Sequence, residues 1–244
     1  MRFAVIADIH GNALALEAVL ADIDALGIAD ILNLGDHLSG PLEAARTADL
    51  ILARDMVSVS GNHDRYLRGD PATLHQWEAD CWHELTPAHH AWLASLPFSR
   101  VWKDEVFLCH ATPQEDNVYW LETVSPDGVV HARSLAEVEA FAEGVPQSLI
   151  LCGHTHLARI VRLTDGRMIV NPGSVGCPGY DDDAPYPHKV EAGAPHAAYA
   201  VIEKAAQGWS VEFRRIAYDW TSAAGIAAAK GRPQWARAIA TGWL

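Results

Sequence analysis

The sequence has few cysteines and no long apolar run, and each shortage excludes a class of protein. Its four cysteines are widely spaced and form no C-x-x-C pair: Cys81, Cys109, Cys152 and Cys177. We therefore expect reduced thiols in a cytoplasmic protein. No apolar segment approaches the ~20 residues that a helix needs to span a bilayer, and the first residues lead into a predicted strand without the layout of a signal peptide. Neither a membrane protein nor a membrane partner is expected.

Basic residues are also scarce. The chain has 18 Lys and Arg against 31 Asp and Glu, and its formal net charge is −13. A protein that binds the phosphate backbone of a nucleic acid needs positively charged stripes on its surface, so a nucleic-acid polymer is not an expected partner. With 244 residues, 50% of them apolar, the chain can bury a sizeable core, and we expect a single domain over residues 1–244.

Apolar segments alternate with helical patterns in the first half of the chain. Three of these segments are apolar or β-branched and predict strands, at residues 3–7, 31–34 and 56–59. A helix capped by Asn12 and stopped at Gly27 follows the first, and others are expected over about 42–53 and within 70–96. This alternation predicts parallel βαβ units.

The second half has strand and hairpin patterns. Strands expected over residues 106–109 and 149–152 each lead into a histidine-containing motif. Hairpins are predicted around Thr164-Asp165-Gly166 and around Gln207-Gly208, which suggests a second, more antiparallel sheet. The Pro- and Gly-rich stretch 172–195 is too long for an ordinary connection, so it predicts a functional or mobile loop.

Short polar motifs follow the predicted strands and carry the chemistry of the chain. They are Asp8-Ile9-His10, Gly35-Asp36, Gly61-Asn62-His63-Asp64, Cys109-His110 and Gly153-His154-Thr155-His156. Ligands of open α/β sheets bind beyond the carboxyl ends of strands, so these motifs are expected to meet at one rim. Carboxylates and imidazoles suit manganese, iron, nickel or zinc. A pair of ions needs a bridging carboxylate, which we assign to Asp36. The sequence therefore predicts a site for two divalent metal ions.

The ordered set D-x-H, G-D, G-N-H-D, H and G-H-x-H resembles that of the calcineurin-like metallophosphoesterases. The resemblance implies an α/β fold with two packed mixed β-sheets flanked by helices, a four-layer αββα sandwich. It assigns the ligands of the first metal to Asp8, His10, Asp36 and His156, and those of the second to Asp36, Asn62, His110 and His154. It also makes His63 the imidazole that assists the leaving group, with Asp64 orienting it.

The likeness extends to residues 8–12, 110–113 and 171–176, which are similar to bacterial small phosphodiesterases and diadenosine-tetraphosphatase-like proteins. Three positions depart from this pattern. Ala111 stands where a glycine is common, His37 replaces an aliphatic residue, and Pro178-Gly179 lacks the arginine that often follows this proline. The loop after Pro178 therefore lacks a cation for phosphate recognition.

The resemblance implies hydrolysis of a phosphodiester or a dinucleoside polyphosphate by a hydroxide that bridges the two ions. The expected partner is thus a small phosphoester or a nucleotide. A phosphomonoesterase and a non-catalytic, protein-binding scaffold on the same fold remain open alternatives. His63 favours the enzyme, because a scaffold could lose this acid and still keep the metal ligands.

Several other residues have two interpretations. Residues 171–176 could form a wall of the substrate site or an ordinary tight turn. His37 is expected to face solvent rather than substrate, and Asp181-Asp182-Asp183 to form a solvated acidic loop rather than a further cation site. The tryptophans of the helical segment are expected to pack helices, although one could stack a nucleobase: Trp77, Trp82 and Trp92.

Overall fold

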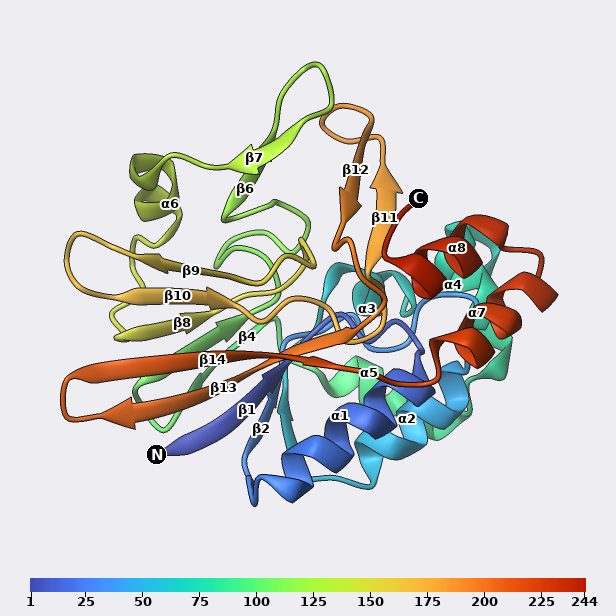
Figure 1. Cartoon of the computed structure of the whole chain (residues 1–244), viewed down its shortest axis with the longest axis horizontal. Coiled ribbons are helices and arrows are strands. Elements are labelled where there is room, and N and C mark those ends of the chain that lie inside the picture. Colours follow the sequence, from blue (N-terminus) through green and yellow to red (C-terminus); the bar gives the residue numbers. More distant parts are fainter.

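Two five-stranded sheets lie face to face, with helices on their outer sides (Figure 1). The structure is a computed structural model that describes all of residues 1–244. Side chains from both sheets meet in the central core, including Phe3 and Leu32 from one sheet and Leu108 and Leu151 from the other. This arrangement confirms the predicted sandwich of two mixed sheets flanked by helices.

The first sheet has the strand order β14-β13-β1-β2-β3. Its members are β1 (Arg2–Ile6), β2 (Ile31–Asn33), β3 (Met56–Ser58), β13 (Ala197–Ala205) and β14 (Gly208–Ile216). β1, β2 and β3 are parallel, as predicted, and are connected by α1 (Ala13–Ala25) and α2 (Ala44–Leu52). The side chain of Asn12 accepts a hydrogen bond from the backbone N–H of Ala15 at 3.1 Å, which confirms the predicted N-cap of α1.

The second sheet has the order β4-β5-β8-β10-β9. Its members are β4 (Ser99–Trp102), β5 (Val106–Cys109), β8 (Leu149–Leu151), β9 (Arg159–Arg162) and β10 (Met168–Asn171). The two predicted hairpins form, but they do not share this sheet: β9–β10 belongs to it, whereas β13–β14 extends the first sheet. The reason lies in β13, where Ala200 and Ile202 face the central core while Tyr199 and Val201 face the helices. A strand that is apolar on both faces is suited to the inside of a sandwich.

The remaining elements surround the two sheets. They are α3 (Asn62–Tyr66), α4 (Gln76–Cys81), α5 (Pro87–Ser95), β6 (Glu122–Val124), β7 (Val130–Ala132), α6 (Leu135–Phe141), β11 (Gly179–Asp182), β12 (His188–Glu191), α7 (Trp220–Ala229) and α8 (Pro233–Thr241). Of these, α6 covers the outer face of the second sheet. The helical segment 70–96 is divided into short pieces, because Pro71 and Pro87 each start a new one. The stretch 172–195 contains the β11–β12 hairpin, so its interpretation as a loop alone was wrong.

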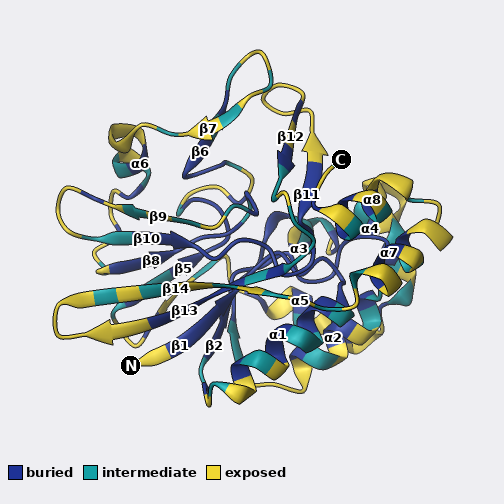
Figure 2. Ribbon diagram, viewed as in Figure 1, coloured by how far each residue is buried: buried dark blue, intermediate teal, exposed yellow.

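Burial follows these layers. The central strands of the sheets, such as β1, β2 and β8, and the loops at their ends are buried, whereas edge strands such as β9 and β14, the outer helix faces and the hairpin tips are more exposed (Figure 2). None of the helices combines the length and the apolar character that crossing a bilayer requires.

Candidate metal centre

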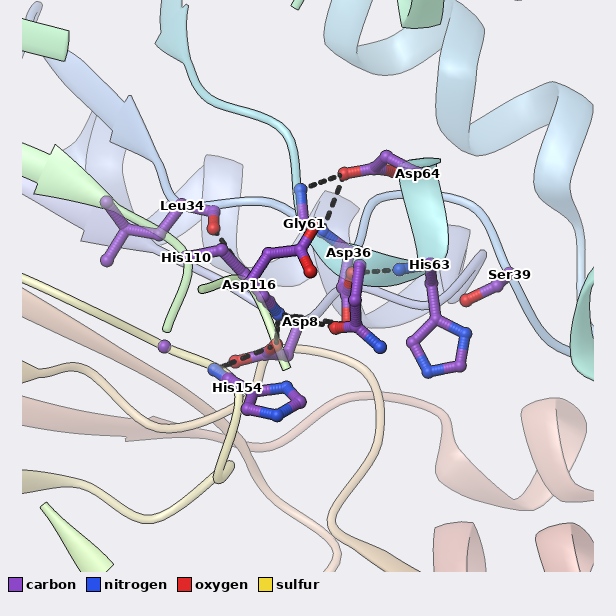
Figure 3. A network of polar contacts seen from close by, with 12 residues as sticks. Asp8, Leu34, Asp36, Ser39, Gly61, His63, Asp64, His110, Asp116 and His154 are labelled. Carbon is purple, nitrogen blue, oxygen red and sulfur yellow. Dashed lines mark hydrogen bonds and ion pairs between the residues drawn. The ribbon is translucent and has the colours of Figure 1, made fainter. Parts of the chain in front are cut away.

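The polar motifs meet in one buried site between the ends of the two sheets. Each motif follows its strand: β1 leads to Asp8, β2 to Asp36, β3 to Asn62, β5 to His110 and β8 to His154. Figure 3 shows several of these side chains converging from separate elements. The predicted meeting at one rim is therefore observed.

The backbone at these positions is strained. Five of the predicted ligands lie in the left-handed region, which non-glycine residues rarely adopt: Asp8 (φ 55°), His10 (φ 49°), Asp36 (φ 56°), His154 (φ 70°) and His156 (φ 58°). Only Lys103 and Asp104 share this region among the other non-glycine residues. Such backbone strain costs of order 1–3 kcal/mol per residue and concentrates at functional sites. These unfavourable backbone conformations lower the stability of the fold, and they direct the five side chains toward the site.

The ligand atoms form two adjacent groups that could each hold a cation. Asp8, His10 and His156 make one group, and Asp36, His110 and His154 make the other, with the ligand atoms of each group within 4.8 Å of one another. The Oδ2 atom of Asp36 lies 3.2 Å from Nε2 of His110 and 3.8 Å from Nε2 of His10. Asp36 thus stands between the two groups, where a bridging carboxylate belongs.

Asn62 joins the second group. Its Oδ1 atom lies 3.1 Å from Nε2 of His110. All seven residues predicted as metal ligands are therefore neighbours in the structure.

Hydrogen bonds at the back of three imidazoles fix their orientation. Nδ1–H of His110 donates to the backbone carbonyl of Leu34 at 2.8 Å, and Nδ1–H of His156 donates to that of Cys177 at 2.7 Å. Nδ1 of His10 lies 2.9 Å from Oγ of Ser39. Since a carbonyl only accepts, Nδ1 of His110 and of His156 carries a hydrogen, and Nε2 is the nitrogen that remains for a metal, as is usual for metal-binding histidines.

Three imidazoles of the metal-free site are neutral at neutral pH. Burial, together with the neighbouring His110, lowers the pKa of His154 to about 3, and burial lowers that of His156 to about 4. The pKa of His10 is also held well below its ordinary value by burial. A neutral imidazole is the form that binds a metal.

Two observations show that the donor set fits cations. Nε2 of His154 is buried without a hydrogen-bond partner. Nε2 of His10 and Nε2 of His156 lie only 3.3 Å apart. A buried lone pair without a partner is costly, and a divalent ion would satisfy these nitrogens together with the carboxylates of Asp8 and Asp36.

The ring of His63 lies beside His10 of the first group, with the centroids 5.3 Å apart, and His63 does not pair with Asp64. Its Nδ1 atom lies 2.5 Å from Oε1 of Glu78, a fully buried carboxylate on α4. Its ring is stacked on Trp77, with the centroids 4.9 Å apart and the planes 14° from parallel. Burial opposes a charge on His63, but Asp36 and the hydrogen bond to Glu78 outweigh burial and raise its pKa above 6.5.

The expected role of Asp64 in orienting His63 was wrong. Asp64 accepts hydrogen bonds from the backbone N–H groups of Gly61 at 2.8 Å and Asp36 at 2.9 Å, and its Oδ2 atom lies 2.8 Å from Nδ1 of His37. The third residue of a helix points back toward the N-cap, whereas the side chain of His63 points in another direction (Figure 3) and contacts Glu78 on α4. Asp64 instead ties two ligand loops together. His37 is fully buried in this pair and does not face solvent.

Glu78 is the functional candidate that the sequence analysis missed. It lies 15 positions after His63, in a segment without a recognisable motif. In the sequence, Glu78 is an acidic residue between Trp77 and Cys81 on a short helix. This position does not by itself indicate a contact with His63.

A cavity of about 490 Å³ opens from the candidate metal centre to the surface. Its inner part includes Asp36, Asn62, His63, His154 and His156. The other lining residues lie in or next to α3, α4 and β11: Tyr66, His75, Gln76, Trp77, Glu78, Tyr180, Asp181, Asp182 and Asp183. The predicted acidic loop 181–183 is exposed at this rim.

Residues 171–176 do not line this cavity, so their interpretation as a substrate wall was wrong. They support the ligand loops from behind. The hydroxyl of Ser174 donates to the backbone carbonyl of Asp8 at 2.8 Å, and the side-chain amide of Asn171 donates to the carbonyl of Gly153 at 2.8 Å.

Comparisons with known proteins agree with this site. The family model described as the calcineurin-like phosphoesterase superfamily domain matches residues 1–187. The uncharacterized protein MJ0912 of Methanocaldococcus jannaschii is 28% identical over 255 residues, which cover 95% of this chain and 94% of the relative. A metallophosphoesterase structure from Sphaerobacter thermophilus has a TM-score of 0.76 at 26% identity and covers 99% of both chains. The hypothetical protein PH1004 from Pyrococcus horikoshii has a TM-score of 0.76 at 20% identity, with 99% and 98% covered. Because the family model spans every strand-end motif, this chain belongs to the calcineurin-like phosphoesterase superfamily.

Proposed function

We propose that this protein is a phosphodiesterase that uses two divalent metal ions. The observation that carries the proposal is the meeting of the two ligand groups and His63 at the inner end of one cavity. A binding scaffold needs no acid beside its metal ligands, whereas a hydrolase gains rate from one.

The metal ions would be held by Asp8, His10 and His156 on one side and by Asn62, His110 and His154 on the other, with Asp36 between them. When bound, two such ions supply charge that neutralises a phosphate and lower the pKa of coordinated water. Their identity among manganese, iron, nickel and zinc is set by availability as much as by these ligands.

His63 is the proton donor to the leaving alcohol in this proposal. Glu78 fixes the ring through Nδ1, which leaves Nε2 to face the substrate. The ring plane is held by Trp77. A general acid of this kind is typically worth ~10²–10⁴ in rate.

The cavity supports a phosphodiester over a dinucleoside polyphosphate. None of its 14 lining residues is Lys or Arg. Two metal ions can neutralise one phosphate group, but further phosphates of a polyphosphate chain would lie beside Asp181, Asp182 and Asp183 without a cation.

The test is hydrolysis by metal-stripped protein reconstituted with each candidate ion. The substrates are bis-p-nitrophenyl phosphate, p-nitrophenyl phosphate and diadenosine tetraphosphate. We expect the diester to have the highest kcat/KM. His63→Ala is expected to lower kcat/KM by roughly 10²-fold or more for diphenyl phosphate, a diester whose poorer leaving group needs the proton. His131→Ala, which changes an exposed histidine on β7, is the control and retains full activity.

The other possible results would each point to a different function or mechanism. Preference for p-nitrophenyl phosphate would replace the proposal with a phosphomonoesterase. Full activity in His63→Ala would remove the acid from the mechanism. Two bound ions with no turnover of any substrate would favour a protein-binding scaffold.

A further inference from the structure

The cavity beside His63 continues into a second hollow, which no step of the proposed hydrolysis explains. This second cavity has a volume of about 290 Å³. It shares Gln76, Trp77, Tyr180 and Asp181 with the first, so the two are adjacent along one wall. Because Trp77 is common to both cavities and is stacked on His63, this wall lies directly against the ring of the proposed proton donor.

The wall is acidic and lacks a free cation. Asp181, Asp182 and Asp183 line the larger cavity. The only Arg or Lys among the residues of the smaller cavity is Arg232, whose Nε–H donates to Asp80 at 2.7 Å and whose charge is thereby neutralised. Lys189 lies opposite Asp181 in the register of the β11–β12 hairpin. It forms no ion pair and lines neither cavity.

The same wall is aromatic. The ring centroid of Trp77 lies 4.7 Å from that of Trp235 and 6.4 Å from that of Tyr180, with the planes 71° and 89° apart. Aromatic rings attract cations, with a strength of about 0.5–2 kcal/mol for an ammonium group.

A buried carboxylate oxygen at this wall also lacks a partner. Glu78 lines the larger cavity, and its Oε1 atom is engaged by His63. Its Oε2 atom is buried without any hydrogen bond. An unpaired, buried carboxylate oxygen is costly, and this one adds negative potential to a wall that already has three aspartates.

We propose that this wall is a subsite for a leaving alcohol that bears an ammonium group, so that the substrate is the phosphodiester of an amino alcohol. The phosphate would lie at the metal centre and the cation between the aromatic rings and the aspartates. This inference rests on the proposed phosphodiesterase function and names its substrate class. It also explains why an acidic rim does not repel the substrate: such a diester has no net charge.

The test compares two substrates that differ only in charge. Glycerophosphocholine is compared with its 3,3-dimethylbutyl isostere, in which carbon replaces the ammonium nitrogen, using the metal-loaded enzyme. We expect kcat/KM for the cationic diester to be roughly tenfold higher. The triple variant Asp181→Asn, Asp182→Asn and Asp183→Asn is expected to lose most of this preference while it still hydrolyses bis-p-nitrophenyl phosphate.

A matched variant controls for the change in net charge. Asp55→Asn, Asp104→Asn and Glu143→Gln removes three exposed carboxylates away from the cavity, and it is expected to keep the preference. Equal kcat/KM for the two diesters, alongside turnover of bis-p-nitrophenyl phosphate, would overturn the subsite and leave the phosphodiesterase intact.

If no diester is hydrolysed, the proposed phosphodiesterase function is overturned. A binding measurement then tests the subsite separately. Calorimetry compares the affinities of phosphocholine and 3,3-dimethylbutyl phosphate, which differ only in the ammonium group that the wall would bind. Tighter binding of phosphocholine, lost in the aspartate triple variant, would sustain the subsite. Equal affinities would overturn it.

Discussion

At the residue scale, the environment of His63 decides how the site could deliver a proton. The imidazole is fixed by Glu78 at Nδ1 and by the face of Trp77, and both side chains come from α4 rather than from the motif that contains His63. A histidine that is fixed in this way presents one nitrogen in a constant direction, which is what general acid catalysis requires.

Glu78→Gln keeps the size of the side chain and removes its charge. We expect kcat/KM to fall by about tenfold for diphenyl phosphate and by less for bis-p-nitrophenyl phosphate, because a poor leaving group depends more on protonation. Glu143→Gln, an exposed change, is the control. An equal loss on both substrates would indicate that Glu78 has only a structural role.

At the element scale, the turn that follows β10 holds the first ligand loop in place. The backbone N–H of Gly176 donates to the carbonyl of Asp8 at 3.0 Å. A Cβ atom at Gly176 would lie 1.7 Å from the carbonyl oxygen of Ile9. This turn therefore needs glycine to approach the Asp8–His10 loop.

Gly176→Ala is expected to lower the free energy of unfolding by about 3 kcal/mol, because the clash is with backbone and not with a movable side chain. It should also weaken metal binding, since the loop that presents Asp8 must shift. Gly225→Ala is the control: this position in α7 has no atom within 4 Å of the added Cβ, and alanine there should stabilise the helix by about 0.5–1 kcal/mol. Urea denaturation of both variants tests the prediction, and equal stabilities would contradict it.

At the scale of the whole molecule, the site residues that directly follow strands could be predicted from the sequence. Contacts between segments far apart in the sequence could not. The strand-end motifs predicted that the seven candidate ligands would meet, because the ends of parallel strands converge in any such sheet. Glu78 was not predictable, since its contact with His63 depends on how α4 packs. The β11–β12 hairpin was hidden by a proline- and glycine-rich composition, and the position of β13 depended on which of its apolar faces met each layer.

The acid–base state of the whole centre predicts how metal uptake depends on pH. In the metal-free site, burial and the nearby Asp36 raise the pKa of Asp8 above its ordinary value. Burial opposes a charge on His110, but Asp36 and Asp8 outweigh it and raise its pKa to about 10. His110 therefore holds a proton at neutral pH, and Asp8 takes one up more readily than an ordinary carboxyl, although each must be deprotonated to bind a metal.

Metal binding should consequently release protons, and the apparent affinity should rise as the pH increases from 6 to 8, roughly tenfold for each proton released per pH unit. Calorimetric titration of Mn²⁺ into stripped protein in buffers of different ionisation enthalpy measures this release. An affinity that does not change with pH would show that the ligands are already deprotonated.

The proposed function requires that two metal ions act together in phosphodiester hydrolysis. The most direct measurement is the rate of bis-p-nitrophenyl phosphate hydrolysis as Mn²⁺ is added in known equivalents to stripped protein. We expect activity to rise until two ions are bound per chain, and Asp36→Asn to abolish this rise. Full activity with a single bound ion, or full activity in Asp36→Asn, would contradict the proposal.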